Sequence, residues 1–226
     1  MITTDIIIFA KAPQSGLAKT RLIPALGADG AAQLARKMLN HAVAQAVHAR
    51  LGSVIIASTP DQQHSAFAVL AQQYEISLID QGSGDLGQRM QSAFESTWQL
   101  EAVEPAAPRV ATKAATKAAI KASQTKQAKQ ILLMGSDIPA IDSSMLILAA
   151  LALQSGDAVF IPTFDGGYAL VGLKSSHPEL FLDMQWSNAL VMQTTRTRAD
   201  ALGLKCCELA PVHDIDNPAD LQHCPF

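Results

Sequence analysis

The chain has 226 residues, of which 49% are apolar and 16% charged, and its formal net charge is −3. This composition supplies enough apolar side chains for one sizeable core, and it excludes a wholly disordered protein. A net charge so close to zero gives no global basic surface for nucleic acid or an anionic membrane. We therefore expect a single domain over 1–226, without a nucleic-acid or membrane partner.

The basic residues are concentrated in one segment. Residues 101–130 include six basic and two acidic residues, whereas the rest of the chain has eleven basic and eighteen acidic ones. Thr-Lys-Ala-Ala-type units recur there every four residues, a pattern typical of a lysine-striped helix or of a disordered segment. No aromatic residue interleaves the lysines, as a surface that stacks nucleic-acid bases requires. We interpret 101–130 as a solvated, low-complexity Ala/Lys-rich insertion within the domain.

Membrane and secretion signals are missing from the pattern. The longest apolar run, at 145–153, is too short to span a bilayer. The first residues lack the basic segment of a secretory signal. Cys206, Cys207 and Cys224 form neither an even set nor a metal-ligand spacing. We therefore expect a cytoplasmic protein with reduced thiols, and the sequence does not indicate its oligomeric state.

Short apolar runs alternate with helical patterns along the chain. Runs rich in β-branched residues predict strands at 5–10, 53–57, 76–79, 131–134, 158–162, 168–173 and 206–209. Apolar residues at helical spacing predict helices at 28–50, 60–74 (with Pro60 at its start), 88–99, 143–154, 188–204 and 217–221, with 11–27 as a long loop. This alternation predicts an α/β fold with a mostly parallel sheet, and the turn at 165–167 adds an antiparallel pair.

The loop after the first strand carries three cations. Lys11, Lys19 and Arg21 lie within 11–22, in a segment shaped by a proline and Gly16. Free backbone N–H groups and several cations suit a diphosphate. The spacing is neither that of a Walker A loop nor that of a Rossmann glycine motif. A plain basic surface loop is the alternative, but active sites of α/β sheets lie beyond the carboxyl ends of strands, which favours phosphate binding.

An aspartate follows the buried strand at 131–134. Asp137 lies in the segment Gly135-Ser136-Asp137-Ile138-Pro139, directly after that strand. A carboxylate at a strand end can hold Mg²⁺ or Mn²⁺, which fills its shell with substrate phosphates and water. The alternative is a cap for the next helix, but Asp142 and Ser143 are better placed for that cap. Asp137 is therefore a candidate metal ligand.

Two acidic motifs come later in the chain. The Asp165-Gly166-Gly167-Tyr168 motif is a strong turn signal and a weak catalytic one. Asp214 and Asp216 are two residues apart, so an extended backbone turns both to one side and Ile215 to the core. Metal binding and helix capping are both open for these two aspartates.

Two further motifs have open interpretations. In the glycine-rich segment 84–90, Arg89 is placed to reach a phosphate, or the segment is an ordinary turn into a helix. Trp186 and Ser187 form either a wall of the substrate site or a corner of the core. No nucleophile–histidine–acid order and no metalloprotease motif is present. Cations, acids and glycines around one crevice suit transfer chemistry on a nucleotide diphosphate.

Taken together and in this order, the motifs resemble the radical-SAM/selenodomain-associated transferase 1 family, also described as arsenosugar-biosynthesis-type glycosyltransferases. That family is similar to nucleotide-diphospho-sugar transferases of GT-A fold. The resemblance covers the chain apart from the insertion. It is carried by Phe9-Ala10-Lys11-Ala12-Pro13, Gly16, Lys19-Thr20-Arg21-Leu22, Gly84-Asp85-Leu86-Gly87-Gln88-Arg89-Met90, Gly135-Ser136-Asp137-Ile138-Pro139, Asp165-Gly166-Gly167-Tyr168, Asp214-Ile215-Asp216, Pro218 and Asp220-Leu221.

The resemblance implies a three-layer α/β/α sandwich, a divalent Mg²⁺ or Mn²⁺ held by Asp137 and Asp216, and catalytic roles for Asp137, Asp165 and Arg21. Asp165 would face the donor or the acceptor. The superfamily's Asp-x-Asp metal motif has one carboxylate here, because Gly135 stands at its first position. The implied nucleotide and phosphate ligands are Lys11, Gly16, Lys19, Arg21, Asp85, Arg89 and Ser136.

The implied activity is transfer of a sugar from a nucleotide-diphospho-sugar to a small acceptor. The alternative is a nucleotidyltransferase similar to molybdenum-cofactor or 2-phospholactate guanylyltransferases, which would use a nucleoside triphosphate and release pyrophosphate. The glycine-rich loop of many such enzymes, G-x-G-x-x-x-R, is missing here. A nucleotide-binding protein without turnover is the third class. The sequence does not indicate the base, the sugar, the acceptor or the stereochemistry.

Overall fold

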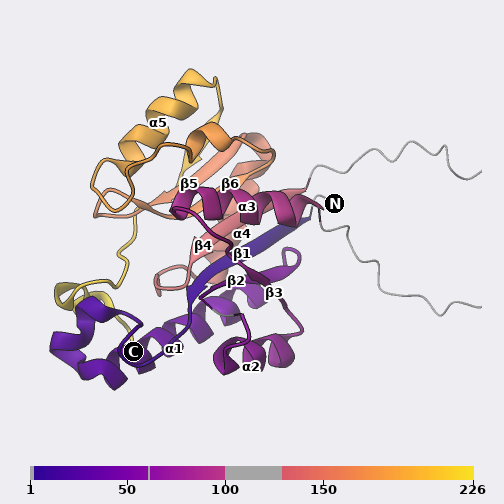
Figure 1. Ribbon diagram of the computed structural model, residues 1–226. Coiled ribbons are helices and arrows are strands. Elements are labelled where there is room, and N and C mark those ends of the chain that lie inside the picture. Colours follow the sequence, from indigo (N-terminus) through magenta and orange to yellow (C-terminus); the bar gives the residue numbers. More distant parts are fainter. Residues whose placement is uncertain (1–2, 61, 100–128) are drawn as a thin grey trace, which may run out of the picture.

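The computed structural model describes residues 3–60, 62–99 and 129–226. The predicted insertion at 101–130 lies outside these residues except for Lys129 and Gln130, and Gln130 already begins a strand. No helix among the described residues is long and apolar enough to cross a membrane. The fold that follows is the α/β sandwich expected from the alternation of strands and helices (Figure 1).

A seven-stranded mixed sheet forms the middle layer, with the strand order β3-β2-β1-β4-β6-β5-β7. Among the described strands, β6 alone runs antiparallel to its neighbours β4 and β5. The other pairs are parallel. The strands are β1 (Thr4–Lys11), β2 (Val54–Thr59), β3 (Ser77–Asp80), β4 (Gln130–Gly135), β5 (Ala158–Pro162), β6 (Tyr168–Leu173) and β7 (Cys206–Glu208).

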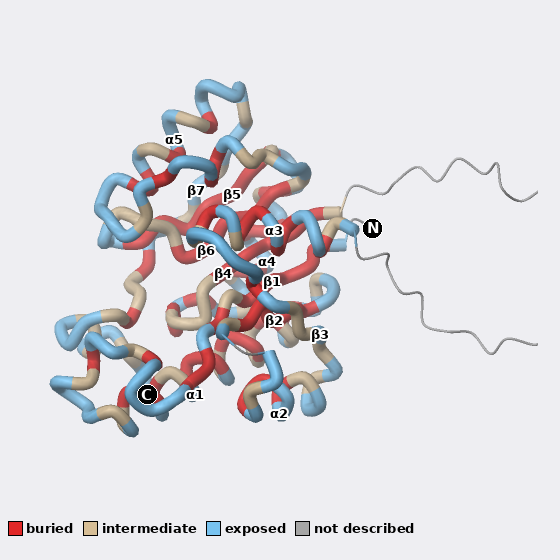
Figure 2. Tube along the Cα trace, viewed as in Figure 1, coloured by how far each residue is buried: buried red, intermediate tan, exposed pale blue. Residues whose placement is uncertain are grey.

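Helices cover both faces of the sheet, which gives the three layers. One face packs against α1 (Ile23–Ala49), α2 (Ser65–Tyr74) and α4 (Ser143–Ser155). The other packs against α3 (Leu86–Gln99), the short η2 (Pro178–Leu180) and α5 (Val191–Ala201). The buried central strands lie between these layers (Figure 2). Two further short helices, η1 (Thr20–Leu22) and η3 (Pro218–His223), lie near each other at the edge of the core.

The position of β1 in the sheet explains the apolar run from Ile6 to Ala10. Ile6 and Ile8 pack into the core on the α1 side, whereas Ile7 packs into the core on the α3 side. All three are fully buried. A central strand with helices on both faces must be apolar at every position, and successive side chains point to opposite faces.

Two predicted helix starts are wrong. Pro60 does not begin a helix, because α2 begins at Ser65. The His64 imidazole supplies the cap instead, since its Nδ1 accepts a hydrogen bond from the Ala66 N–H at 3.2 Å. The predicted loop at 11–27 is too long, because η1 and the start of α1 lie within it. Gly27, with φ +71°, interrupts α1 near its first turn.

The last long helix is shorter than predicted. The pattern indicated 188–204, but α5 spans Val191–Ala201. The Asn188 side chain explains the later start, because its Oδ1 accepts a hydrogen bond from the Leu190 N–H at 2.7 Å. Asparagine often binds nearby backbone in this way and so competes with helix formation. The segment before α5 is thereby free to line the cleft described below.

The ion pair between Arg196 and Glu208 joins α5 to β7, and we expect it to make stability depend on pH. Two bonds of 2.7 Å join the guanidinium to the carboxylate. The hydrogen bonds from Arg196 hold the pKa of Glu208 below its usual value. A carboxylate whose pKa is lowered in the folded state stabilises that state at pH values where it is ionised. Glu208→Gln should therefore cost up to about 1 kcal/mol at pH 7. Urea unfolding at pH 7 and pH 3 checks this: the cost should be smaller at pH 3, where protonation of Glu208 begins to remove the ion pair, and an equal cost at both pH values would contradict it.

Candidate active site

A cleft of about 440 Å³ opens at the carboxyl edge of the sheet. Strands β1 and β4 are parallel neighbours, so the segments that follow them meet at this edge. Arg21 comes from the segment after β1 and Asp137 from the segment after β4. Four carboxylates line the cleft, namely Asp137, Asp165, Asp214 and Asp216.

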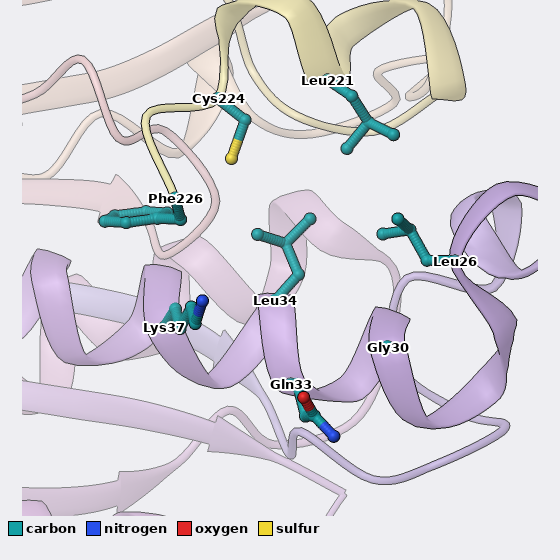
Figure 3. A pocket seen from close by; sticks show the side chains of 8 residues that line it. All are labelled: Leu26, Gly30, Gln33, Leu34, Lys37, Leu221, Cys224 and Phe226. Carbon is teal, nitrogen blue, oxygen red and sulfur yellow. The ribbon is translucent and has the colours of Figure 1, made fainter.

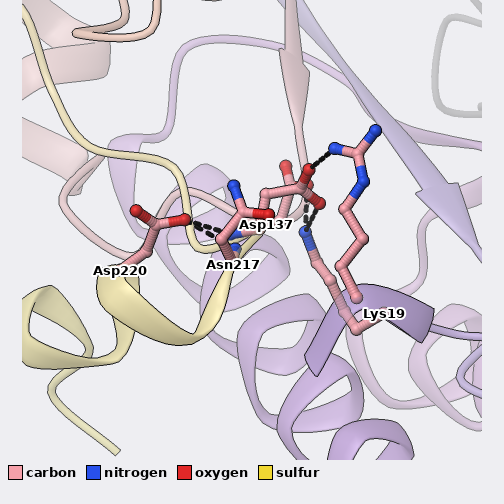
Figure 4. A network of polar contacts seen from close by, with 6 residues as sticks. Lys19, Asp137, Asn217 and Asp220 are labelled. Carbon is pink, nitrogen blue, oxygen red and sulfur yellow. Dashed lines mark hydrogen bonds and ion pairs between the residues drawn. The ribbon is translucent and has the colours of Figure 1, made fainter. Parts of the chain in front are cut away.

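Two of these carboxylates share one ammonium group (Figure 4). The Lys19 Nζ lies 2.6 Å from Oδ2 of Asp137 and 3.3 Å from Oδ1 of Asp216. The Arg21 guanidinium is also paired with Asp216. Burial alone would lower the pKa of Lys19, but the carboxylates of Asp137 and Asp216 outweigh burial and raise that pKa. Lys19 is therefore fully protonated at neutral pH.

The loop that carries Lys19 is anchored on both sides of it. Ala18 and Leu22 are buried, whereas residues 14–17 are exposed. Lys19 itself has φ +47°, in the left-handed region that side chains seldom adopt. The Lys19 carbonyl accepts a hydrogen bond from the Leu22 N–H at 2.8 Å, which closes η1. These contacts fix the backbone and direct the Lys19 side chain toward Asp137 and Asp216, which line the cleft.

The segment with Asp214 and Asp216 has the predicted alternation. Ile215 is fully buried and its N–H donates a hydrogen bond to the Asp137 carbonyl at 3.1 Å. Asp214 and Asp216 on either side of it line the cleft. The Asp220 carboxylate accepts hydrogen bonds from the N–H groups of Asp216 and Asn217, at 3.0 and 2.6 Å (Figure 4). The first turn of η3 thus holds Asp216 in place.

The remaining two carboxylates, Asp165 and Asp214, repel each other. Burial, followed by the charges of Asp165 and Asp137, raises the pKa of Asp214 to about 6. Asp165 is held at the β5–β6 turn, where it accepts hydrogen bonds from the Thr163 hydroxyl and from the Gly167 N–H. The side chain of Asp165 therefore has a defined position at the cleft rather than a free rotamer.

The wall across from these acids is partly aromatic. Trp186 lines the cleft and also packs into the core on the α3 side. Ser187 lines the cleft as well. The segment is seated on the turn at Gly166, whose carbonyl accepts a hydrogen bond from the Met192 N–H at 2.8 Å. Residues to which the sequence analysis assigned no role also line the cleft, among them Phe9, Leu86, Met90, Asn188 and Ala189.

Several predicted phosphate ligands lie outside the cleft lining. Lys11 and Gly16 are exposed, at the end of β1 and in the following loop. Ser136 belongs to the segment after β4, where its N–H donates to the Phe9 carbonyl at 3.1 Å. These three residues surround the carboxyl edge of β1 and β4 without entering the cavity.

Asp85 and Arg89 have local partners at the start of α3. The Asp85 carboxylate accepts a hydrogen bond from the Gln88 N–H at 2.9 Å, so it caps that helix. The Arg89 guanidinium donates to the Gln81 side chain at 3.2 Å. Gln81 was missed at the sequence level. It is buried and donates to the Ala57 carbonyl at 2.8 Å, so it ties Arg89 to the end of β2.

The acids of the cleft can be tested as a metal site. Among the described residues, no group of three or more His, Cys, Asp or Glu side chains is arranged to hold a metal ion. Mg²⁺, however, needs only one or two protein carboxylates when substrate phosphates and water complete its shell. Asp137 and Asp216 each place an oxygen within 3.3 Å of one point, the Lys19 Nζ. The pair therefore supplies the number of protein carboxylates that such a cation requires.

A second cavity, of about 280 Å³, lies between α1 and the C-terminal segment (Figure 3). Its lining is mostly apolar, with Leu26, Leu34, Leu221 and Phe226. Lys37 is the one charged side chain among its lining residues, and no carboxylate is present there. The cavity therefore lacks the acidic side chains that line the first cleft.

The architecture is shared with solved structures of transferases. A candidate nucleotide-diphospho-sugar transferase from Desulfovibrio desulfuricans G20 is 26% identical, with a TM-score of 0.76 over 96% of this chain and 84% of that one. 4-Diphosphocytidyl-2C-methyl-D-erythritol synthase from Anaerococcus prevotii DSM 20548 is 12% identical, with a TM-score of 0.59 over 98% and 94%. A nucleotidyl transferase from Methanothermobacter thermautotrophicus is 11% identical, with a TM-score of 0.56 over 98% and 95%. The two more distant likenesses establish the fold alone.

Fold and site together define an α/β protein with a transferase-type sheet and an acid-rich cleft at its carboxyl edge. The chain belongs to the family described as "uncharacterized protein conserved in bacteria" (DUF2064), whose model matches residues 42–188. No curated protein matches the chain significantly.

Proposed function

We propose that the protein is a metal-assisted glycosyltransferase of the radical-SAM/selenodomain-associated type, which moves a sugar from a nucleotide-diphospho-sugar to a small acceptor. The observation that carries this proposal is the cluster of Arg21, Asp137 and Asp216, which line one cleft, with Lys19, which is paired with both aspartates. Such a cluster combines cations for a diphosphate with carboxylates for a divalent metal. The 26% identity to a candidate nucleotide-diphospho-sugar transferase supports the same class.

In this reaction the bond between the sugar C1 and the diphosphate oxygen breaks, and C1 bonds to an acceptor oxygen. The leaving diphosphate gains negative charge, which Arg21 and Lys19 would stabilise. A bound Mg²⁺ or Mn²⁺ on Asp137 and Asp216 would neutralise further charge on the diphosphate. The acceptor hydroxyl loses a proton, and Asp214 and Asp165 are the carboxylates of the cleft available to take it. Asp214, with a pKa of about 6, is suited to that role near neutral pH.

The second candidate is a nucleotidyltransferase. The same cations and carboxylates would bind a nucleoside triphosphate and stabilise pyrophosphate as it leaves. The fold is similar to those of a nucleotidyl transferase and of a diphosphocytidyl-methylerythritol synthase, and this similarity supports the second candidate. The two reactions differ in the donor consumed and in the phosphate product released.

A thermal-shift panel separates the two reactions. The panel contains UDP, GDP and CDP, their sugar conjugates, GTP and CTP, each with and without Mg²⁺ or Mn²⁺. A ligand at about 100 times its Kd adds about 2.7 kcal/mol of stability, which shifts the melting temperature by several degrees. We expect the largest shift with one nucleotide-sugar and only when metal is present, followed by release of the nucleoside diphosphate when an acceptor is supplied.

The other outcomes decide against the glycosyltransferase. A shift with a triphosphate and none with sugar conjugates, together with pyrophosphate release, would establish the nucleotidyltransferase. A shift with a nucleotide but no product from any donor would indicate a binding protein without turnover. No shift with any nucleotide would contradict both transferase proposals.

A further inference from the structure

The carboxylate pair of the cleft already holds a cation that belongs to the chain. The Lys19 ammonium lies at 2.6 Å from Asp137 and 3.3 Å from Asp216. Its side chain is 11% exposed, whereas the Arg21 side chain next to it is 64% exposed. Lys19 is thus the inner cation of the cluster, and its charge offsets part of the repulsion between the two acids.

The Lys19 ammonium cannot pair with the two carboxylates and with a diphosphate at the same time. The ammonium has three donors, and its two ion pairs direct them at the carboxylates that would hold a divalent cation. A divalent cation bound by Asp137 and Asp216 would place like charges in contact with Lys19, at a cost that falls only when the ammonium moves away. The diphosphate of the proposed reaction would meanwhile need Lys19 as a counter-charge.

We propose that Lys19 is an internal counter-ion that occupies the Asp137–Asp216 pair, yields it when a divalent cation binds, and is thereby released toward the diphosphate. This inference rests on the proposed function only for the last of these steps. The exchange couples metal and diphosphate binding, because each cation then has its own anionic partner. It also keeps two neighbouring acids neutralised whenever no substrate is present.

The loop permits this exchange without refolding. Ala18 and Leu22 are buried on either side of Lys19, so the backbone keeps its place. The lysine stem has four rotatable bonds, and its head is a compact point charge that changes partners readily. Exchange therefore requires a rotamer change of one side chain rather than a movement of the loop.

The first test is Mn²⁺ binding in the absence of any nucleotide, measured by isothermal titration calorimetry on the full chain. Lys19→Met removes the competing ammonium and retains the length of the side chain. We expect this variant to bind Mn²⁺ at least about tenfold more tightly than the wild type, because the ammonium that pairs with both carboxylates is gone. Lys205→Met is the matched control, because Lys205 is an exposed lysine just before β7 and does not line the cleft. It should leave the Mn²⁺ affinity close to that of the wild type.

The second test follows Lys19 in the wild-type chain. Brief treatment with acetic anhydride, read by mass spectrometry, reports how accessible each lysine is. We expect Mn²⁺ to raise the modification of Lys19 severalfold, with the exposed Lys205 as the internal reference that does not change. This measurement does not depend on how well the Lys19→Met variant folds.

The outcomes separate this inference from the proposed function. Equal or weaker Mn²⁺ binding by Lys19→Met, or Lys19 that stays protected at saturating Mn²⁺, would overturn the exchange. Failure of both proteins to bind Mn²⁺ would overturn it as well, because the pair would then not be a metal site. A positive exchange with no response to any nucleotide would instead leave Lys19 as a counter-ion and reject the transferase.

Discussion

Replacing Gly166 with alanine is expected to destabilise the protein by about 3 kcal/mol and to lower its melting temperature by roughly 6–12 °C. Gly166 has φ +94°, and a Cβ there would lie 2.2 Å from the Ala189 carbonyl oxygen. The contact is with backbone, so no side-chain rotamer can relieve it. The segment from Trp186 to Ala189 must shift, and this segment is one wall of the cleft. Thermal and urea unfolding measure the loss, and ligand binding should weaken with it.

Gly203→Ala is the matched control for this prediction. Gly203 also has a positive φ, of +67°, but a Cβ there would meet nothing within 4 Å. The backbone penalty alone is about 1 kcal/mol, so the difference between the two variants reports the contact with Ala189. Equal losses at both positions would show that the wall is not seated on Gly166.

The fold was predictable because its strands carry a strong signal. β1 is apolar from Ile6 to Ala10, and β5 and β6 surround a glycine turn, so the mixed sheet follows from the sequence. Asp142 was also predictable as the cap of α4, and its carboxylate does accept a hydrogen bond from the Met145 N–H at 2.8 Å. These features depend on residues close together in the chain, whose spacing in the sequence determines the local geometry.

The candidate site was predictable only in part, because its contacts connect distant residues. The acids and cations could be named, but nothing in the spacing of Lys19, Asp137 and Asp216 shows that they meet across 118 and 197 residues. Arg89 was expected near phosphate, whereas its partner is Gln81, an uncharged residue with no motif of its own. The place of apolar residues such as Met90 in the cleft was not predicted, because a helix end that lines a cleft has the same apolar pattern as one that packs in the core.

Asp137→Asn is expected to lower turnover of whichever donor the nucleotide panel identifies by at least about 100-fold. The substitution keeps the size of the side chain and removes the charge that pairs with Lys19. It leaves the Asp137 carbonyl, which accepts the hydrogen bond from Ile215, so the segment should keep its place. Steady-state kinetics should show the loss in kcat/KM, while circular dichroism shows a folded protein.

Asp142→Asn is the control for this change, since Asp142 lies five residues further on and also carries a hydrogen-bonded carboxylate. Asparagine caps helices as well as aspartate does, so α4 should remain intact and stability should change by less than about 0.5 kcal/mol. Turnover should stay close to that of the wild type, because Asp142 lines no part of the cleft. Comparable activity of the two variants would show that the charge of Asp137 is not used in the reaction. A large loss in both would instead point to the conformation of the segment between them, since Ile138 and Ile141 pack in the same core and a disturbance there would reach the acids of the cleft.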